Sequence, residues 1–197
     1  MIALGGPIFK EFDNPEEWIV ALRQQGYSAA YCPLPIEETN SVTIQAYAGA
    51  AQQSDVIIAE VGAWSNPLSR DEAIRPAALD KCQRSLALAD EIDARCCVNI
   101  AGSLGDKWDG PWADDLSADT FDLIVETVRK IIDAVKPSRS FYTLETMPWM
   151  YPDSPDSYLE LIRAIGRPAF AVHLDPINLI NSPQRYFRQR DLIKECF

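Results

Sequence analysis

The chain has 197 residues, and its 18 Lys and Arg against 29 Asp and Glu give a formal net charge of −11. This excess of acid argues against a nucleic acid as partner, because phosphate backbones are bound by clustered basic side chains. With 47% apolar and 24% charged residues the composition is that of a globular protein, and no apolar run reaches the roughly 18 residues of a membrane span.

Cysteine usage and the N-terminus bear on the compartment. Five cysteines, an odd number without a repeated spacing, indicate neither a disulfide framework nor a thiolate zinc site. The first residues, Met-Ile-Ala-Leu-Gly-Gly, lack the basic-then-apolar order of a secretory signal. We therefore expect reduced thiols and a cytoplasmic protein.

Strands and helices are predicted to alternate along the chain. The predicted strands are short apolar runs between turn residues, at 2–6, 27–33, 55–62, 96–102, 140–146 and 169–175. The first helix has Asn14 as its N-cap and Pro15 at its first position, and Gly26 lies just beyond its end. Later helices are predicted over 69–94, from Ser117 or Asp119 onward, over 155–165 and over 183–197.

The loops indicate how these units are arranged. Those that follow strands are long and rich in Trp, Pro, Gly and Asp, at 62–70, 102–116 and 146–156, whereas those that precede strands are short. This asymmetry is typical of a (β/α)8 barrel, whose active site is built from the loops after the strands. A doubly wound open sheet is the alternative, but the chain has no Gly-x-Gly-x-x-Gly fingerprint.

The number of units is smaller than a complete barrel requires. A TIM barrel has eight β/α units in about 250 residues, and we count six here. We therefore predict an α/β, TIM-barrel-type fold in a single domain over 1–197, C-terminally incomplete and lacking the last two strands. Either a truncated product or a six-unit remnant would explain the count. The free edges of the first and sixth strands would favour self-association, so a homo-oligomer is one expected state.

Two acidic residues, Glu145 and Asp175, each end a predicted strand. The even-numbered residues of both strands are bulky and apolar, and the odd-numbered ones carry the polar groups. Because side chains alternate across a strand, both acids should point away from the face that packs on helices. Parallel neighbours lie about 5 Å apart, so the two carboxylates could hold one divalent cation between them. A helix cap or a loop-anchoring hydrogen bond is the structural alternative for such acids.

Three sequence segments resemble one family. They are Val-Gly-Ala-Trp64-Ser-Asn-Pro-Leu, Thr-Leu-Glu145-Thr-Met and His173-Leu-Asp175-Pro-Ile-Asn178. They are similar to the sugar phosphate isomerase/epimerase family, part of the xylose isomerase-like TIM barrel group that also includes endonuclease IV. The resemblance extends over nearly the whole chain.

This resemblance implies a metal site. Family members bind one divalent metal, Mn²⁺, Mg²⁺ or Co²⁺, through four side chains at the ends of strands five to eight. Glu145 and Asp175 match the ligands of strands five and six, and Glu145 also matches the acid/base residue. The His of strand seven and the Glu of strand eight have no counterpart in the chain. The His that commonly follows the strand-six Asp by three residues is replaced by Asn178.

Further pocket residues are expected around this pair. Glu60 could bind a sugar hydroxyl or form a buried salt bridge with an Arg. Asn99, expected to point inward on its strand beside Cys97, could contact substrate or bond within the barrel interior. Trp64 is the loop aromatic best placed to stack on a sugar, and Asn178 could hydrogen-bond substrate. His173, the only histidine, is expected one layer deeper as a partner of the metal ligands rather than a ligand itself.

Three functions remain open at this point. The first is a metal-dependent isomerase or epimerase of a sugar or sugar phosphate, acting through a metal-stabilised enediolate or a hydride shift. The second is a non-catalytic or truncated barrel that binds a ligand without turnover. The third is an endonuclease IV-like nuclease, which is disfavoured because its zinc cluster needs several histidines.

Overall fold

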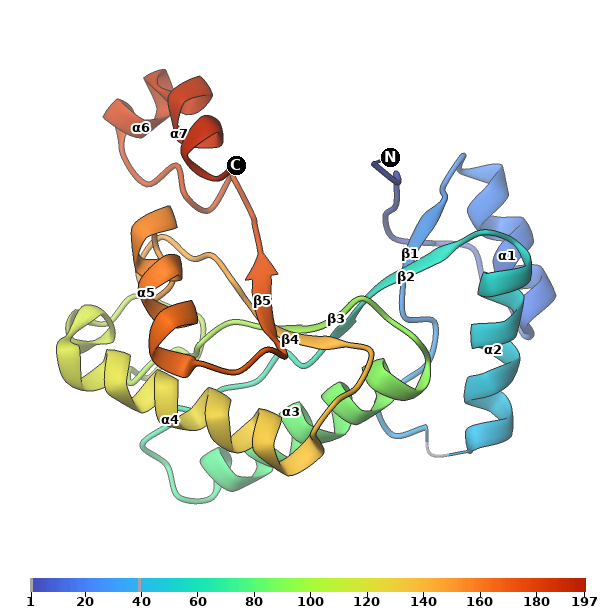
Figure 1. Ribbon diagram of the computed structural model, residues 1–197, viewed down its shortest axis with the longest axis horizontal. Coiled ribbons are helices and arrows are strands. Elements are labelled where there is room, and N and C mark those ends of the chain that lie inside the picture. The colour runs from blue at the N-terminus through green and yellow to red at the C-terminus, as the bar shows by residue number, and fades with distance from the viewer. Residues whose placement is uncertain (1, 39) are drawn as a thin grey trace.

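The computed structural model describes residues 2–38 and 40–197 and contains one five-stranded parallel sheet (Figure 1). The strands are β1 (Ala29–Tyr31), β2 (Ile57–Gly62), β3 (Cys96–Asn99), β4 (Phe141–Glu145) and β5 (Phe170–His173). They lie side by side in chain order, and every neighbouring pair is parallel. A doubly wound sheet reverses its strand order at a switch point, and this sheet has none. The predicted barrel-type α/β arrangement is therefore confirmed.

The helices follow the predicted order. They are α1 (Pro15–Gln24), α2 (Ser41–Gln53), α3 (Ile74–Glu91), α4 (Ala118–Val135), α5 (Pro155–Ile165), α6 (Pro183–Phe187) and α7 (Gln189–Glu195), with a 3-10 turn over Ala113–Leu116. Asn14 caps α1 by accepting the Glu17 N–H, and Ser117 caps α4 by accepting the Thr120 N–H. These side chains satisfy backbone donors that the first turn of a helix leaves free. Local sequence signals therefore set most helix starts.

The strand predicted over residues 2–6 is wrong, because these residues do not form a full strand. Residues 2–6 form only an isolated parallel bridge, between Gly5 and Ala29, and the Leu4 carbonyl accepts the N–H groups of Ser28 and Ala29. Gly5 and Gly6 give this segment no side chains to pack, and Ile2 is 98% exposed. The segment lies beside β1 without extending the sheet by a full strand.

The last predicted helix is also wrong. It is broken at Arg188, and the resulting α6 and α7 project beyond the carboxyl end of β5 rather than covering the outer face of that strand (Figure 1). Val172, an apolar residue of β5 predicted to pack on helices, is 53% exposed as a result. The outer face of β5 is thus partly uncovered in the described chain.

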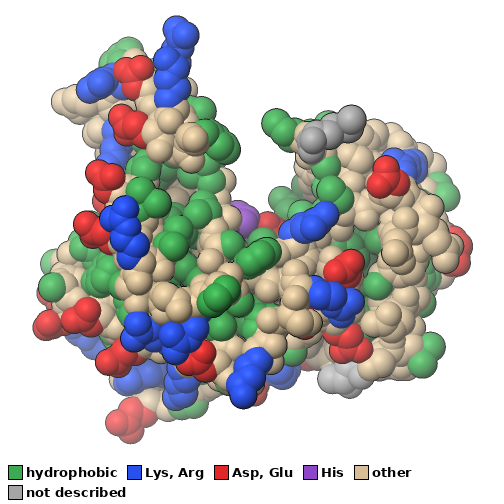
Figure 2. Space-filling model, viewed as in Figure 1, with side chains coloured by type: hydrophobic (Ala, Val, Ile, Leu, Met, Phe, Trp, Pro, Cys, Tyr) green, Lys and Arg blue, Asp and Glu red, His purple; other side chains and the backbone are tan. Residues whose placement is uncertain are grey.

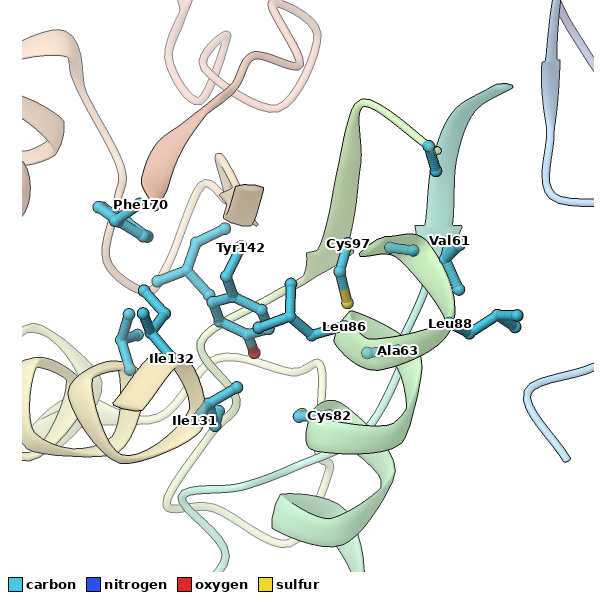
Figure 3. Close-up of a cluster of buried hydrophobic side chains, with 14 of the residues drawn as sticks. Val61, Ala63, Cys82, Leu86, Leu88, Cys97, Ile131, Ile132, Tyr142 and Phe170 are labelled. Carbon is cyan, nitrogen blue, oxygen red and sulfur yellow. The ribbon is translucent and has the colours of Figure 1, made fainter. Parts of the chain in front are cut away.

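The core lies between the sheet and α3 and α4. Tyr142, Cys97 and Val61 point from the strands toward Leu86 and Ile131 on these helices (Figure 3). All five are buried, and burying such apolar area is the main favourable term in folding. The opposite face of the sheet carries the polar side chains, so it is the face on which a site can form.

No helix within residues 2–38 and 40–197 is long and apolar enough to cross a membrane. Each of the five cysteines is a free thiol. Burial raises the pKa of Cys32 and of Cys96 to about 11, so these thiols stay protonated at neutral pH.

Asp90, at the end of α3, holds the loop that leads into β4. Its Oδ1 accepts the backbone N–H groups of Ser138, Arg139 and Ser140 at 2.8, 2.6 and 3.0 Å. Burial on its own would raise the pKa of Asp90, but these hydrogen bonds outweigh it and the pKa is lowered. The ionised carboxylate therefore stabilises the start of the strand that carries Glu145.

We predict that Asp90→Asn lowers the free energy of unfolding by about 1 kcal/mol at neutral pH, after discounting for solvent screening. A carboxyl whose pKa is lowered by folding stabilises above its unfolded pKa of about 3.9 and loses that effect as pH falls. The difference from wild type should therefore persist at neutral pH and shrink below about pH 4. Urea unfolding at several pH values measures this difference.

Asp80 is the control, because it forms an exposed ion pair with Arg84 on the same helix. The Asp80→Asn variant should change the free energy of unfolding by less than about 0.5 kcal/mol. Equal losses of stability in Asp90→Asn and Asp80→Asn would contradict the stabilising role of the Asp90 hydrogen bonds.

Candidate functional site

The predicted acid pair lies on the face of the sheet that is free of helices. Glu145 ends β4 and is paired with His173 in the β4–β5 ladder, and Asp175 follows β5 by two residues. Tyr142 and Leu144, on the alternate positions of β4, are fully buried against the helices. The side-chain alternation predicted for β4 is confirmed, and it directs Glu145 toward the opposite face.

The pKa of Glu145 responds to burial and to its charged neighbours. Burial raises the pKa of Glu145, the charge of His173 opposes that rise, and the nearby carboxyl of Asp175 and the charge of Glu60 raise it further. Two carboxylates within reach of one another disfavour double ionisation. The pair is therefore suited to sharing a proton or a cation.

A turn after β5 fixes the orientation of both carboxylates. Asp175 Oδ1 accepts the backbone N–H groups of Ile177 (2.8 Å) and Asn178 (3.4 Å). This turn brings Nδ2 of Asn178 to 3.0 Å from Oε1 of Glu145, to which it donates. Asn178 was predicted to contact substrate, and in this structure it orients Glu145.

Glu60 and His173 form a pair on the same face. Nε2 of His173 lies 2.9 Å from Oε2 of Glu60, although β2 and β5 are separated by two strands. The predicted Arg partner of Glu60 is therefore wrong. Burial lowers the pKa of His173, but the hydrogen bond and charge of Glu60, with the charges of Glu145 and Asp175, raise it overall. Nδ1 of His173 is buried without a hydrogen-bond partner among the described residues.

A bulge in β2 explains how Glu60 reaches this face. The ladder pairs Ala30 with Ile58 but Tyr31 with Glu60, so β2 carries one extra residue. Ile58 and Val61 are both buried, three positions apart. Strict alternation would place Glu60 on the same face as Ile58, but the bulge shifts the alternation and directs Glu60 to the opposite face.

Glu60 and Trp64 line a cavity of about 340 Å³ together with Tyr31 and Gly62. Trp64 is 42% exposed and its indole lies over Gly62, where an added Cβ would be 2.2 Å from Nε1. Only glycine allows this close approach. Figure 2 shows a hollow in the molecular surface between the α6–α7 segment and the elements around β1.

Asn99 does not face this cavity. It is fully buried, and its amide donates to the Ser65 carbonyl (3.1 Å) and to Sγ of Cys82 on α3 (3.4 Å) while Oδ1 accepts the Ser65 N–H (3.1 Å). The predicted inward orientation is wrong, since the contact with Cys82 places Asn99 on the helix-facing side of β3. Its amide anchors the segment that follows Trp64.

The loops around the hollow are held by buried polar groups that the sequence did not single out. Asn66 donates to the Ser103 carbonyl at 2.7 Å and packs so closely on Gly102, at φ +99°, that a Cβ there would lie 2.2 Å from its Oδ1. Asp115 is fully buried and accepts the Ser103 hydroxyl and the Leu104 N–H. Such strand-end hydrogen bonds join loops distant in sequence, which periodicity alone does not reveal.

The donor set at the acid pair suits a hard cation. Glu145 and Asp175 supply carboxylate oxygens, and no described residue donates a hydrogen bond to Oε2 of Glu145 or Oδ2 of Asp175. Mg²⁺ and Mn²⁺ prefer oxygen ligands. A cation would offset both the burial of Glu145 and the charges of Asp175 and Glu60, which together raise the pKa of Glu145. Within residues 2–38 and 40–197, no three His, Cys, Asp or Glu side chains are arranged to hold a metal, so the pair could offer at most two ligands of this kind.

A parallel sheet in chain order, helices on one face and polar side chains at the carboxyl ends of the strands define an α/β protein of the TIM-barrel class. The chain belongs to the xylose isomerase-like TIM barrel family, whose model matches residues 19–195. No curated protein matches the chain.

Several solved structures have the same fold. A D-psicose 3-epimerase of Clostridium cellulolyticum H10, with D-tagatose, superposes with a TM-score of 0.67 at 16% identity, over 94% of this chain and 65% of that one. A probable 3-DHS dehydratase of Bacillus anthracis gives 0.64 at 16% identity, over 92% and 66%. A xylose isomerase-like protein of Mycobacterium smegmatis in complex with magnesium gives 0.60 at 17% identity, over 90% and 64%. The chain spans less than two thirds of each of these structures.

We predict that Asn99→Ala lowers the free energy of unfolding by about 2 kcal/mol, because it leaves the N–H and C=O of Ser65 without partners. Urea unfolding measures the change. Ser85→Ala is the matched control on α3, since the Ser85 hydroxyl is fully buried without a partner among the described residues, and its loss should change stability by less than about 0.5 kcal/mol. If the Asn99→Ala variant proved as stable as the Ser85→Ala variant, the anchoring role of Asn99 would be refuted.

Proposed function

We propose that this chain takes part in metal-assisted isomerisation or epimerisation of a sugar or sugar phosphate. The observation that carries the proposal is the convergence of Glu145 and Asp175 at the carboxyl ends of adjacent strands, on the helix-free face. Family membership supports it, and the related epimerase with bound D-tagatose indicates the class of substrate to test first.

In this proposal Glu145 and Asp175 hold a divalent cation, Mn²⁺, Mg²⁺ or Co²⁺. When bound, such a cation polarises a carbonyl oxygen and an adjacent hydroxyl and so eases loss of a proton from carbon. The oxygen donors of the pair agree with a hard cation. The related structure in complex with magnesium is consistent with this choice.

Glu145 is also the proposed acid/base residue. Burial and the neighbouring acids raise its pKa, and a raised pKa makes a carboxylate a stronger base toward a carbon-bound proton. The hydrogen bond from Asn178 fixes the direction of its Oε1. The proton taken up by Glu145 can be returned to the neighbouring carbon, which gives isomerisation. Epimerisation requires in addition a second proton donor on the opposite face of the same carbon.

Glu60 and Trp64 are the proposed substrate-binding residues. Both line the cavity of about 340 Å³, which is large enough for a monosaccharide. An indole stacks on the C–H face of a sugar, and a carboxylate accepts its hydroxyl protons. His173, held by Glu60 at 2.9 Å, orders that carboxylate. Free thiols support a reducing, cytoplasmic location.

A second candidate is a sugar-binding module without turnover. It is favoured by the two cation ligands that the described residues offer, where the family resemblance implies four. Deuterium incorporation from D₂O into a ketose incubated with the chain and Mn²⁺ separates the candidates. Incorporation at carbon supports the enzyme with proton transfer, and sugar binding without incorporation supports the module.

We predict that Glu145→Gln weakens Mn²⁺ binding by about 100-fold or more, because losing even an outer-shell partner of a metal costs 10–100-fold. Isothermal titration with Mn²⁺ measures the affinity. Glu160→Gln, an exposed position on α5, changes the same functional group and should leave the affinity as in wild type. Unchanged Mn²⁺ affinity in Glu145→Gln would show that the cation binds elsewhere.

A further inference from the structure

The hydroxyl of Tyr158, on α5, reaches into the seam between β4 and β5. It donates to the Leu144 carbonyl at 2.7 Å and lies 3.0 Å from the Ala171 carbonyl. It also accepts the His173 N–H at 3.0 Å and faces the Leu144 N–H at 3.3 Å. One phenol oxygen therefore contacts both strands in the residues just before the two acids.

The hydroxyl of Thr146 lies on the other side of the acid pair. Thr146 follows Glu145 directly, and its Oγ1 donates to the Asp175 carbonyl at 2.9 Å and accepts the Asp175 N–H at 3.0 Å. Both polar groups of the Asp175 backbone are thus bound by one side chain. Thr146 is 1% exposed and Tyr158 4%, so water does not compete for these bonds.

We propose that Tyr158 and Thr146 are positioning residues that set the separation of the Glu145 and Asp175 carboxylates, and through it the cation affinity of the pair. This inference rests on the proposed cation site. The Tyr158 hydroxyl binds the backbones of Leu144 and His173, which precede the acids on β4 and β5. The Thr146 hydroxyl binds the backbone of Asp175 itself, so a change at either hydroxyl shifts one acid relative to the other. A carboxylate pair must be held within fractions of an ångström to keep its cation geometry.

The chain contains matched hydroxyls that lack this placement. Tyr142 is fully buried on β4, but its hydroxyl faces Cys82 in the core below the sheet. Thr143 is 1% exposed on β4, but its hydroxyl donates to the Cys97 carbonyl on the β3 side, at 3.1 Å. Tyr→Phe and Thr→Val at these positions remove the same atoms without touching the β4–β5 seam.

The test compares Mn²⁺ affinity, by isothermal titration, in wild type and in single variants of the whole chain. Tyr158→Phe and Thr146→Val should each weaken Mn²⁺ binding by about tenfold, the lower end of the effect of outer-shell partners. Thr146→Ser, which keeps the hydroxyl, should restore the affinity. Tyr142→Phe and Thr143→Val should bind Mn²⁺ as wild type does, even where urea unfolding shows a similar loss of stability.

The outcomes separate this inference from the proposed function. Wild-type affinity in both Tyr158→Phe and Thr146→Val would overturn the inference and leave the cation site standing. Equal weakening in the controls would also overturn it, because general loosening of the fold would then explain the effect. Absence of Mn²⁺ binding by the wild-type chain would overturn the proposed function and this inference together.

Discussion

The arrangement of the candidate site depends on two carboxylates of like charge being held together where two parallel strands end. Glu145 and Asp175 come within reach because β4 and β5 are adjacent and parallel, and because a turn after β5 brings Asp175 back toward Glu145. Burial raises the pKa of Glu145, and the nearby acids raise it further because they disfavour a second negative charge. A protein maintains such a repulsion only where surrounding contacts fix the backbone, and those contacts account for the polar groups on β2, α5 and the loop after β4.

These contacts form two layers around the acids. Below them Glu60 and His173 join β2 and β5 on the helix-free face. The side chain of Glu60 is 17% exposed and that of His173 is 24% exposed. Beside them hydroxyl groups bind strand backbones directly. By contrast, ion pairs such as Arg70–Asp114 lie on the rim with more than half of each side chain exposed, where a pair contributes little. The buried hydrogen bonds, rather than the surface charges, therefore determine how well the site is ordered.

Much of this could be predicted from the sequence where the signal is local. Alternation in β4 predicted the direction of Glu145, and the helix predicted over 155–165 is α5 at its observed residues. Asn99 could not be placed, because β3 is buried on both faces and its Cys-Cys-Val-Asn sequence has no polar side to mark one of them. Glu60 reaches the interior through a bulge, which shifts the alternation without a sequence signal. Its partner lies 113 residues away, so neither residue alone predicts the pair.

The same reasoning explains why Tyr158 and Thr146 escaped prediction. Tyr158 lies in the apolar stripe of α5, where an aromatic residue is expected to pack, and its ring does pack on Phe170 at a centroid distance of 6.0 Å. The hydroxyl acts beyond that packing, by contacting two strands at once. A phenylalanine would fill the same space and preserve the periodicity, so hydrophobic pattern cannot distinguish the two. Tyrosine can be distinguished from phenylalanine at this position only once the backbone groups of the two strands have been located. Residues that position a site are therefore best sought among the polar atoms of side chains that otherwise pack as apolar ones.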